Sequence, residues 1–112
     1  MTPDQAARIE PLIRRALDED LGDGDITTLA TIPPDAVYSG QFLVKQAGVI
    51  AGLEVARMTF SLLDERMQFD AQVYDSETVE AGTVVALVKG PGRALLSGER
   101  VALNFLQRMS GI

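Results

Sequence analysis

The segment at residues 67–74 alternates strictly between apolar and polar side chains, and this pattern restricts the folds open to the chain more than any other feature. Successive side chains of a β-strand point to opposite faces of a sheet, so the alternation predicts a strand with one buried face. Such a strand needs partner strands and a second layer over its apolar face. Further strands are predicted at residues 38–46, 48–52 and 83–88, with a turn at 80–82 and a break at 89–92.

Three segments repeat apolar residues with the period of an α-helix, and they can form that second layer. The first begins with a capping-box pattern at residues 2–5, with proline at the first helical position, and extends to about Asp20. Pro11 either kinks this helix or begins a second one, and Gly22 is expected to terminate it. The other two helices are predicted at residues 53–63 and 93–109. We therefore expect one α+β domain, with its helices segregated against a small sheet.

Composition argues against several kinds of function. The 112 residues include no histidine and no cysteine, so the chain has no imidazole base and no thiol nucleophile, and it lacks the side chains that most zinc sites use. Its formal net charge of −6 argues against a nucleic-acid partner, for which a basic surface is expected. We find no secretory signal and no apolar run of the ~20 residues that would span a bilayer, so no membrane partner is expected. The lack of cysteine fits a reducing compartment, and we expect a cytoplasmic protein.

The predicted last helix has two faces when its residues are placed about 100° apart. Its polar stripe consists of Arg93, Ser97, Arg100, Asn104 and Arg108, and its apolar face of Leu95, Ala102, Phe105, Leu106 and Met109. Guanidinium groups bind carboxylates and phosphates in a bidentate manner, so the stripe could form an anion-binding surface. The alternative is that it is simply the solvated face of an amphipathic helix.

An acidic cluster at residues 19–25 extends into a predicted ordered loop at 21–34 and could suggest a metal site. It lacks the alternation and the closing glutamate of a calcium-binding loop. Helix termination at Gly22 and a turn directly after it account for the pattern, so we assign no metal ligand and no catalytic residue to this chain. Lys45 and Lys89 are the remaining reactive side chains, but neither has the hairpin-tip context of a biotinyl or lipoyl carrier.

Two motifs lie near opposite ends of the chain. Residues 16–28 read ALDEDLGDGDITT, residues 98–112 read GERVALNFLQRMSGI, and a Gly-x-x-x-Gly-Leu pattern stands between them at 48–53. In wording and order these motifs resemble the EDLG-x-GD-x-T and ER-x-x-LN-x-x-x-x-SGIAT segments of the quinolinate phosphoribosyltransferase family. Because the chain stops abruptly within the second motif, we expect residues 1–112 to be a truncated N-terminal domain that includes the start of a linker helix to a C-terminal α/β barrel.

The resemblance implies a fold and an activity. The fold is an open-faced, hammerhead-like α/β sandwich, with a small, mainly antiparallel sheet and long flanking helices. Family members convert quinolinate and phosphoribosyl pyrophosphate to nicotinate mononucleotide, pyrophosphate and carbon dioxide in NAD biosynthesis, and they use Mg²⁺. Their active site lies at the barrel mouth, and the sandwich domain of a neighbouring subunit closes it in at least a dimer.

The resemblance also assigns one site residue. The arginine of the ER motif is Arg100, and in the family this arginine contacts the quinolinate carboxylates across the dimer. Arg93 and Arg108 are expected to be peripheral, and Mg²⁺ to be held mainly outside residues 1–112, so the isolated chain should be inactive. Two alternatives stay open: a molybdenum-transport relative of the same architecture, and a free-standing protein-interaction module.

Overall fold

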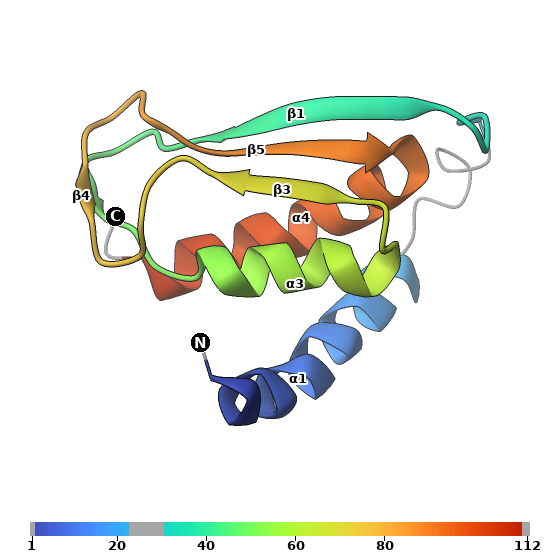
Figure 1. Ribbon diagram of the computed structural model, residues 1–112, viewed down its shortest axis with the longest axis horizontal. Helices are drawn as coiled ribbons and strands as arrows, with labels where there is room; N and C mark the ends of the chain where they lie inside the picture. Colours follow the sequence, from blue (N-terminus) through green and yellow to red (C-terminus); the bar gives the residue numbers. More distant parts are fainter. Residues whose placement is uncertain (1, 23–30, 111–112) are drawn as a thin grey trace.

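The computed structural model describes residues 2–22 and 31–110 (Figure 1). In chain order its elements are α1 (Pro3–Gly22), β1 (Val37–Leu43), β2 (Gly48–Val49), α3 (Leu53–Leu63), β3 (Gln68–Ala71), β4 (Thr78–Val79), β5 (Val84–Pro91) and α4 (Gly92–Met109). Figure 1 shows three layers: a sheet, then α3 and α4 side by side beneath it, then α1 on the far side of these two helices. This arrangement confirms the predicted α+β class, with helices segregated to one face of an antiparallel sheet.

The main sheet has the strand order β1-β5-β3, and both pairings are antiparallel. Val88 in the central strand stands opposite Gly40 on one side and Phe69 on the other, and this row faces the helices. The next row of the pleat, formed by Gln41, Leu87 and Asp70, points the other way and is exposed. None of the described helices covers that outer face, so the sandwich is open on this side (Figure 1).

The main core lies between the sheet and the helix pair. Three phenylalanines meet there, Phe42 from β1, Phe60 from α3 and Phe69 from β3, with ring centroids 6.0 to 6.2 Å apart. Phe60 is fully buried, and the buried Thr59 hydroxyl donates to the Val55 carbonyl at 2.8 Å, so its polar atom is satisfied within the helix. The alternating burial predicted for residues 67–74 is confirmed, although β3 itself is shorter.

A second apolar cluster attaches α1 to the outer side of the helix pair. Ile13 and Leu17 of α1 pack with Val55 of α3 and Val101 of α4, and Phe105 lies against them. The helices α3 and α4 are therefore buried on two sides, one toward the sheet and one toward α1. This packing places the last turn of α1 beside the middle of α4, which brings two regions far apart in the sequence to one surface.

The N-terminal helix is continuous, so Pro11 does not begin a second helix. The predicted capping box is present: the Thr2 amide donates to the Gln5 side-chain oxygen at 2.9 Å, and the Gln5 amide donates to the Thr2 hydroxyl at 3.2 Å. The described part of this helix reaches Gly22, the residue expected to terminate it. Leu21 and Gly22 therefore belong to α1 and not to the loop predicted at residues 21–34, and the part of that loop at 23–30 lies outside the described residues.

Several predicted strand limits are wrong. β1 ends at Leu43 and β2 covers only Gly48–Val49. Gly52, the expected end of the second strand, has a left-handed conformation (φ 93°) and is the N-cap of α3. The break expected at residues 89–92 is also misplaced, since β5 continues to Pro91 alongside the start of β1. The two-residue strand Thr78–Val79, which pairs with β2, is too short to show a period in the sequence.

None of the described helices combines the length and the apolar content needed to cross a bilayer.

Candidate functional site

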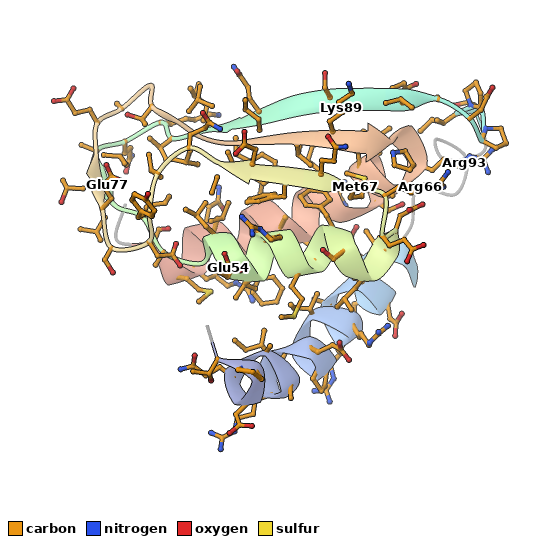
Figure 2. The ribbon with its side chains drawn as sticks, viewed as in Figure 1. Glu54, Arg66, Met67, Glu77, Lys89 and Arg93 are labelled. Atoms are coloured by element: carbon orange, nitrogen blue, oxygen red, sulfur yellow. The ribbon has the colours of Figure 1, made fainter. Side chains whose placement is uncertain are left out.

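The three arginines of the predicted polar stripe have different environments. Arg93, near the start of α4, donates its Nε hydrogen to the Ile32 carbonyl at 2.8 Å. Figure 2 shows Arg93 at the end of the sheet where α4 begins. This bond attaches the segment that precedes β1 to α4, so Arg93 has a structural partner, and its expected peripheral role stays a prediction.

Arg100, in the middle of α4, is exposed to solvent. Its side chain is 68% exposed, and its Nη1 donates to Oδ1 of Asp20 at 3.2 Å, while the Asp20 side chain is only 22% exposed. A guanidinium has five N–H donors, and this contact uses one of them. The remaining donors of Arg100 stay available to an anion that approaches from solvent.

The sequence does not reveal the acidic partner of Arg100, since the acid beside it in the chain is Glu99. Glu99 is adjacent in the sequence but lies about 100° around the helix, where it lines a different depression. Asp20 is 80 residues away from Arg100, and only the packing of α1 on α4 brings them together. A local sequence pattern carries no information about such a pair.

The far end of the stripe borders a shallow depression of about 210 Å³ between α1 and α4. It is lined by Ala16, Glu19, Asp20, Val101, Asn104, Phe105 and Arg108. Arg108 makes no ion pair with any described residue within 4.0 Å. With a rise of 1.5 Å per residue, Arg93 and Arg108 are separated by about 22 Å along the axis. The stripe is therefore not one cluster, and a small anion can contact Arg100 without contacting Arg93.

The predicted apolar face of α4 is confirmed for Leu95, Ala102 and Leu106, which are buried. Met109 is 47% exposed, and Phe105 packs toward α1 instead of toward the sheet. The buried residues Gly98 and Val101 were absent from the prediction. They are buried because α4 has two covered sides, one under the sheet and one against α1.

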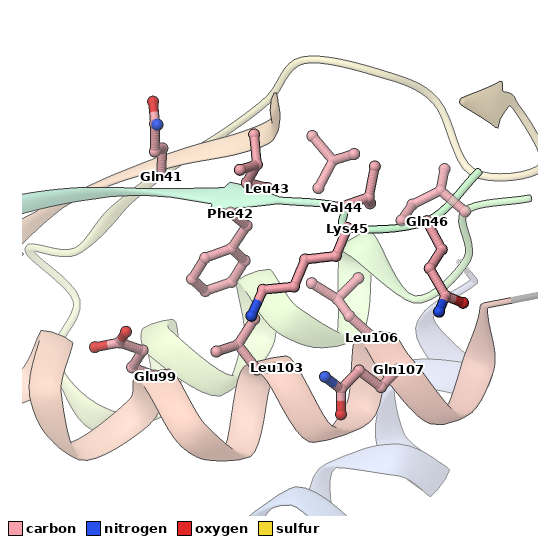
Figure 3. A pocket seen from close by; sticks show the side chains of 12 residues that line it. Gln41, Phe42, Leu43, Val44, Lys45, Gln46, Glu99, Leu103, Leu106 and Gln107 are labelled. Carbon is pink, nitrogen blue, oxygen red and sulfur yellow. The ribbon is translucent and has the colours of Figure 1, made fainter. Parts of the chain in front are cut away.

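The two candidate lysines lie apart from this stripe. Lys45 follows β1 and lines a depression of about 570 Å³ between the β1 edge and α4, together with Glu99, Leu103 and Gln107. Figure 3 shows the Lys45 side chain extending toward Leu103. Lys89 lies within β5, opposite Ser39 and Gln68 on the exposed outer face of the sheet. Neither lysine stands at a hairpin tip.

Within residues 2–22 and 31–110, no three Asp, Glu, His or Cys side chains gather in a group that could hold a metal ion. Glu19 and Asp20 belong to the last turns of α1, whereas Asp23 and Asp25 of the same sequence cluster lie outside the described residues.

Comparison with known proteins confirms the resemblance that the motifs indicated. The sequence matches the family described as "Quinolinate phosphoribosyl transferase, N-terminal domain" over residues 25–110. It is 40% identical over 105 residues to quinolinate phosphoribosyltransferase [decarboxylating] 1b of Nicotiana tabacum, which covers 93% of this chain and 30% of that protein. It is 38% identical over 105 residues to the probable nicotinate-nucleotide pyrophosphorylase [carboxylating] of Bacillus subtilis, covering 94% of this chain and 36% of the relative.

The fold is shared with solved structures of similarly named proteins. NadC from Streptococcus pyogenes superposes with a TM-score of 0.84 at 37% identity, over 96% of this chain and 38% of that one. The nicotinate-nucleotide pyrophosphorylase from Francisella tularensis superposes with a TM-score of 0.81 at 27% identity, over 96% and 37%. The chain thus spans about a third of the length of the relatives it matches. It belongs to the quinolinate phosphoribosyltransferase family, and it corresponds to the N-terminal domain of the family's proteins.

Proposed function

We propose that this domain serves an enzyme that converts quinolinate and phosphoribosyl pyrophosphate to nicotinate mononucleotide, pyrophosphate and carbon dioxide in NAD biosynthesis. The names of the relatives support this reaction, since they describe a decarboxylating quinolinate phosphoribosyltransferase and a carboxylating nicotinate-nucleotide pyrophosphorylase. In this reaction the pyridine nitrogen displaces pyrophosphate at the ribose, and one ring carboxyl group is then lost. The chemical steps take place in the barrel domain, and the present domain contributes to binding.

One observation carries the role of this domain: the guanidinium of Arg100 is exposed and uses one N–H on Asp20. Quinolinate has two adjacent carboxylates, and a planar guanidinium can bridge them through parallel hydrogen bonds. Neutralising this charge orients the ring and its nitrogen for attack. We propose that Arg100 makes this contact with quinolinate bound in the barrel of a neighbouring subunit, which makes the enzyme at least a dimer.

The divalent cation has its place outside this domain. Mg²⁺ accompanies the diphosphate substrate, and we assign it no ligand from residues 1–112. Because the ribose-phosphate and metal sites belong to the barrel, the isolated domain should not turn over quinolinate. Detectable product formation by the purified 112-residue chain would contradict this part of the proposal.

The compartment proposed for the enzyme is the cytoplasm, which the lack of cysteine supports. Some relatives carry the words mitochondrial or chloroplastic in their names. Fractionation of cells that express a tagged full-length enzyme tests the assignment directly.

Isothermal titration of quinolinate into the full-length enzyme that carries this domain tests the role of Arg100. Loss of a charge-assisted contact should make Arg100→Ala bind about ten- to a hundredfold more weakly. Arg14→Ala is a matched control, because Arg14 is also exposed and paired with one carboxylate, that of Glu10. Unchanged binding in Arg100→Ala would leave the family assignment intact but would contradict the proposed contact of Arg100 with quinolinate. An absence of quinolinate binding in the unmodified enzyme would favour the molybdenum-transport alternative.

Subunit mixing tests whether Arg100 acts across the dimer. At a quinolinate concentration well below the KM of the unmodified enzyme, Arg100→Ala subunits alone should show little activity, and subunits inactivated in their barrel should show none. Hybrid dimers contain one intact domain facing one intact barrel, so the mixture should regain part of the activity. If the mixture stays inactive although hybrids form, the contact lies within one subunit. A full-length protein that stays monomeric at working concentration would favour the interaction-module alternative.

A further inference from the structure

We infer that Asp20 is a positioning residue for Arg100: its carboxylate holds one edge of the guanidinium so that the other edge is presented to the substrate. The inference rests on the proposed function of Arg100. It starts from the hydrogen bond of 3.2 Å between Arg100 Nη1 and Asp20 Oδ1, which joins the last turns of α1 to the middle of α4.

The two charged residues are carried by backbones that apolar packing fixes against each other. Leu17 stands three residues before Asp20, on the same side of α1, and Val101 directly follows Arg100. Both Leu17 and Val101 belong to the buried cluster between α1, α3 and α4, and they are 5% and 4% exposed. The carboxylate therefore has a defined position relative to the helix that carries Arg100.

The pair is unlike the other ion pairs among the described residues. Those three join residues two to four positions apart: Glu10 with Arg14, Glu54 with Arg57 and Asp64 with Arg66. Within the described part of the chain, only the pair of Asp20 and Arg100 connects two helices. An exposed pair contributes little to stability, so its tertiary geometry is better explained by its effect on the arginine.

That effect is a restriction of rotamers. A free arginine has many side-chain conformations, and immobilising it upon ligand binding costs free energy. Holding Nη1 on Asp20 before the substrate arrives removes part of this cost and leaves the other N–H groups free. The Asp20 side chain is also more buried than the Arg100 side chain. The carboxylate that holds the guanidinium is therefore the more ordered of the two groups.

The test is Asp20→Asn in the full-length enzyme, with quinolinate affinity measured by titration. We expect the Kd and the KM for quinolinate to rise about two- to tenfold, as for the loss of preorganisation of one long side chain. The KM for phosphoribosyl pyrophosphate and the melting temperature should stay close to those of the unmodified enzyme. A purely structural role would instead lower the melting temperature or change both KM values together.

Two control variants remove the same charge elsewhere. Asp64→Asn removes the acid of an ion pair with nearly the same exposures, 71% and 20%, and Asp18→Asn removes an exposed acid of α1. Both should leave the quinolinate Kd unchanged. The conservative Asp20→Glu keeps a carboxylate and should bind more tightly than Asp20→Asn. Equal Kd values for the Glu and Asn variants would contradict a role for the charge.

A double-mutant cycle separates failure of this inference from failure of the proposed function. In an Arg100→Ala background, Asp20→Asn should have no further effect on the Kd, since no guanidinium is left to position. If Arg100→Ala itself binds quinolinate normally, the proposed function is wrong. If Arg100→Ala weakens binding but Asp20→Asn binds equally well or more tightly, Asp20 does not position Arg100 and this inference is wrong.

Discussion

The hydroxyl of Ser110 satisfies both backbone polar groups of Ala51: it accepts from the Ala51 amide at 2.9 Å and donates to the Ala51 carbonyl at 3.0 Å. These bonds join the residue after α4 to the segment that enters α3. The next residue, Gly52, has φ 93°. The Met109 side chain packs against it so closely that a Cβ at Gly52 would lie about 3.0 Å from the Met109 sulfur. The serine of the second motif and the second glycine of the Gly-x-x-x-Gly-Leu pattern therefore belong to one contact and have structural roles.

Replacing Ser110 with alanine should destabilise the chain. Two partly buried backbone groups lose their partner, so we expect the free energy of unfolding to fall by about 1–3 kcal/mol, measured by urea denaturation. Ser61→Ala is the control, because the Ser61 hydroxyl donates to the Arg57 carbonyl at an exposed position. Its effect should stay within about 0.5 kcal/mol. Equal stabilities for the two variants would show that water replaces Ser110 at no cost.

Gly98→Ala tests the close approach of α3 and α4. A Cβ at Gly98 would stand 2.8 Å from a methyl of the partly buried Leu63 and 3.0 Å from the ring of the fully buried Phe60. Overpacking of this kind costs about 1–3 kcal/mol, and the better helix propensity of alanine offsets about 1 kcal/mol of it. We expect a net loss of about 1 kcal/mol in thermal or urea unfolding. Gly40→Ala, whose Cβ would lie 3.8 Å from Val88, should not be destabilised by a clash.

The features predicted correctly from the sequence depend on residues close to each other in the chain. The capping box needs only Thr2 and Gln5, and the buried face of β3 needs only the alternation around Phe69. The helices follow from apolar periods of three and four residues. The role of Arg100 stays a prediction that rests on the wording of a family motif, because its physical environment resembles that of many exposed arginines.

The features that were missed depend on partners far away in the chain. The glycine and proline at positions 90 and 91 argue against a strand there, but β5 continues through both residues because β1 pairs with it. Gly90 is suited to this position because Met67 packs against its backbone, where a Cβ would clash. The pairing of Asp20 with Arg100 requires the docking of α1, and a pattern confined to either helix cannot reveal it.

Thr2→Ala tests whether the capping box holds the first turn of α1. The variant loses the hydroxyl that accepts from the Gln5 amide, so the free energy of unfolding should fall by about 0.5–2 kcal/mol. Thr2→Ser keeps the hydroxyl and should retain the stability. Far-ultraviolet circular dichroism should report a small loss of helix in the alanine variant alone; an equal loss in both variants would mean that the hydroxyl is not responsible.

The turn between α3 and β3 contains a bidentate ion pair of Asp64 and Arg66, which gives the chain a specific response to acid (Figure 2 labels Arg66). The Arg66 side chain donates to both oxygens of Asp64, at 3.1 and 2.8 Å, and the Arg66 amide donates to Oδ1 at 2.9 Å. The side-chain bonds first, and then the backbone bond, lower the pKa of Asp64 from 3.8 to about 2. Because the folded state holds the carboxylate in its ionised form, Asp64 stabilises the fold above pH 3.8, and this contribution is lost as the pH falls through about 2.

Comparison with Asp64→Asn isolates this contribution from that of the other acidic residues. The stability advantage of the unmodified chain over the variant should be constant above about pH 5 and should shrink between pH 3.8 and about 2. Urea midpoints measured at several pH values give this difference. Titration of the Asp64 carboxyl carbon by NMR gives the pKa itself, which should rise part of the way toward 3.8 in Arg66→Ala, because the two side-chain bonds are lost while the backbone amide of residue 66 can still donate to Oδ1. An Asp64 that titrates near 3.8 in the unmodified chain would mean that these hydrogen bonds do not persist in solution.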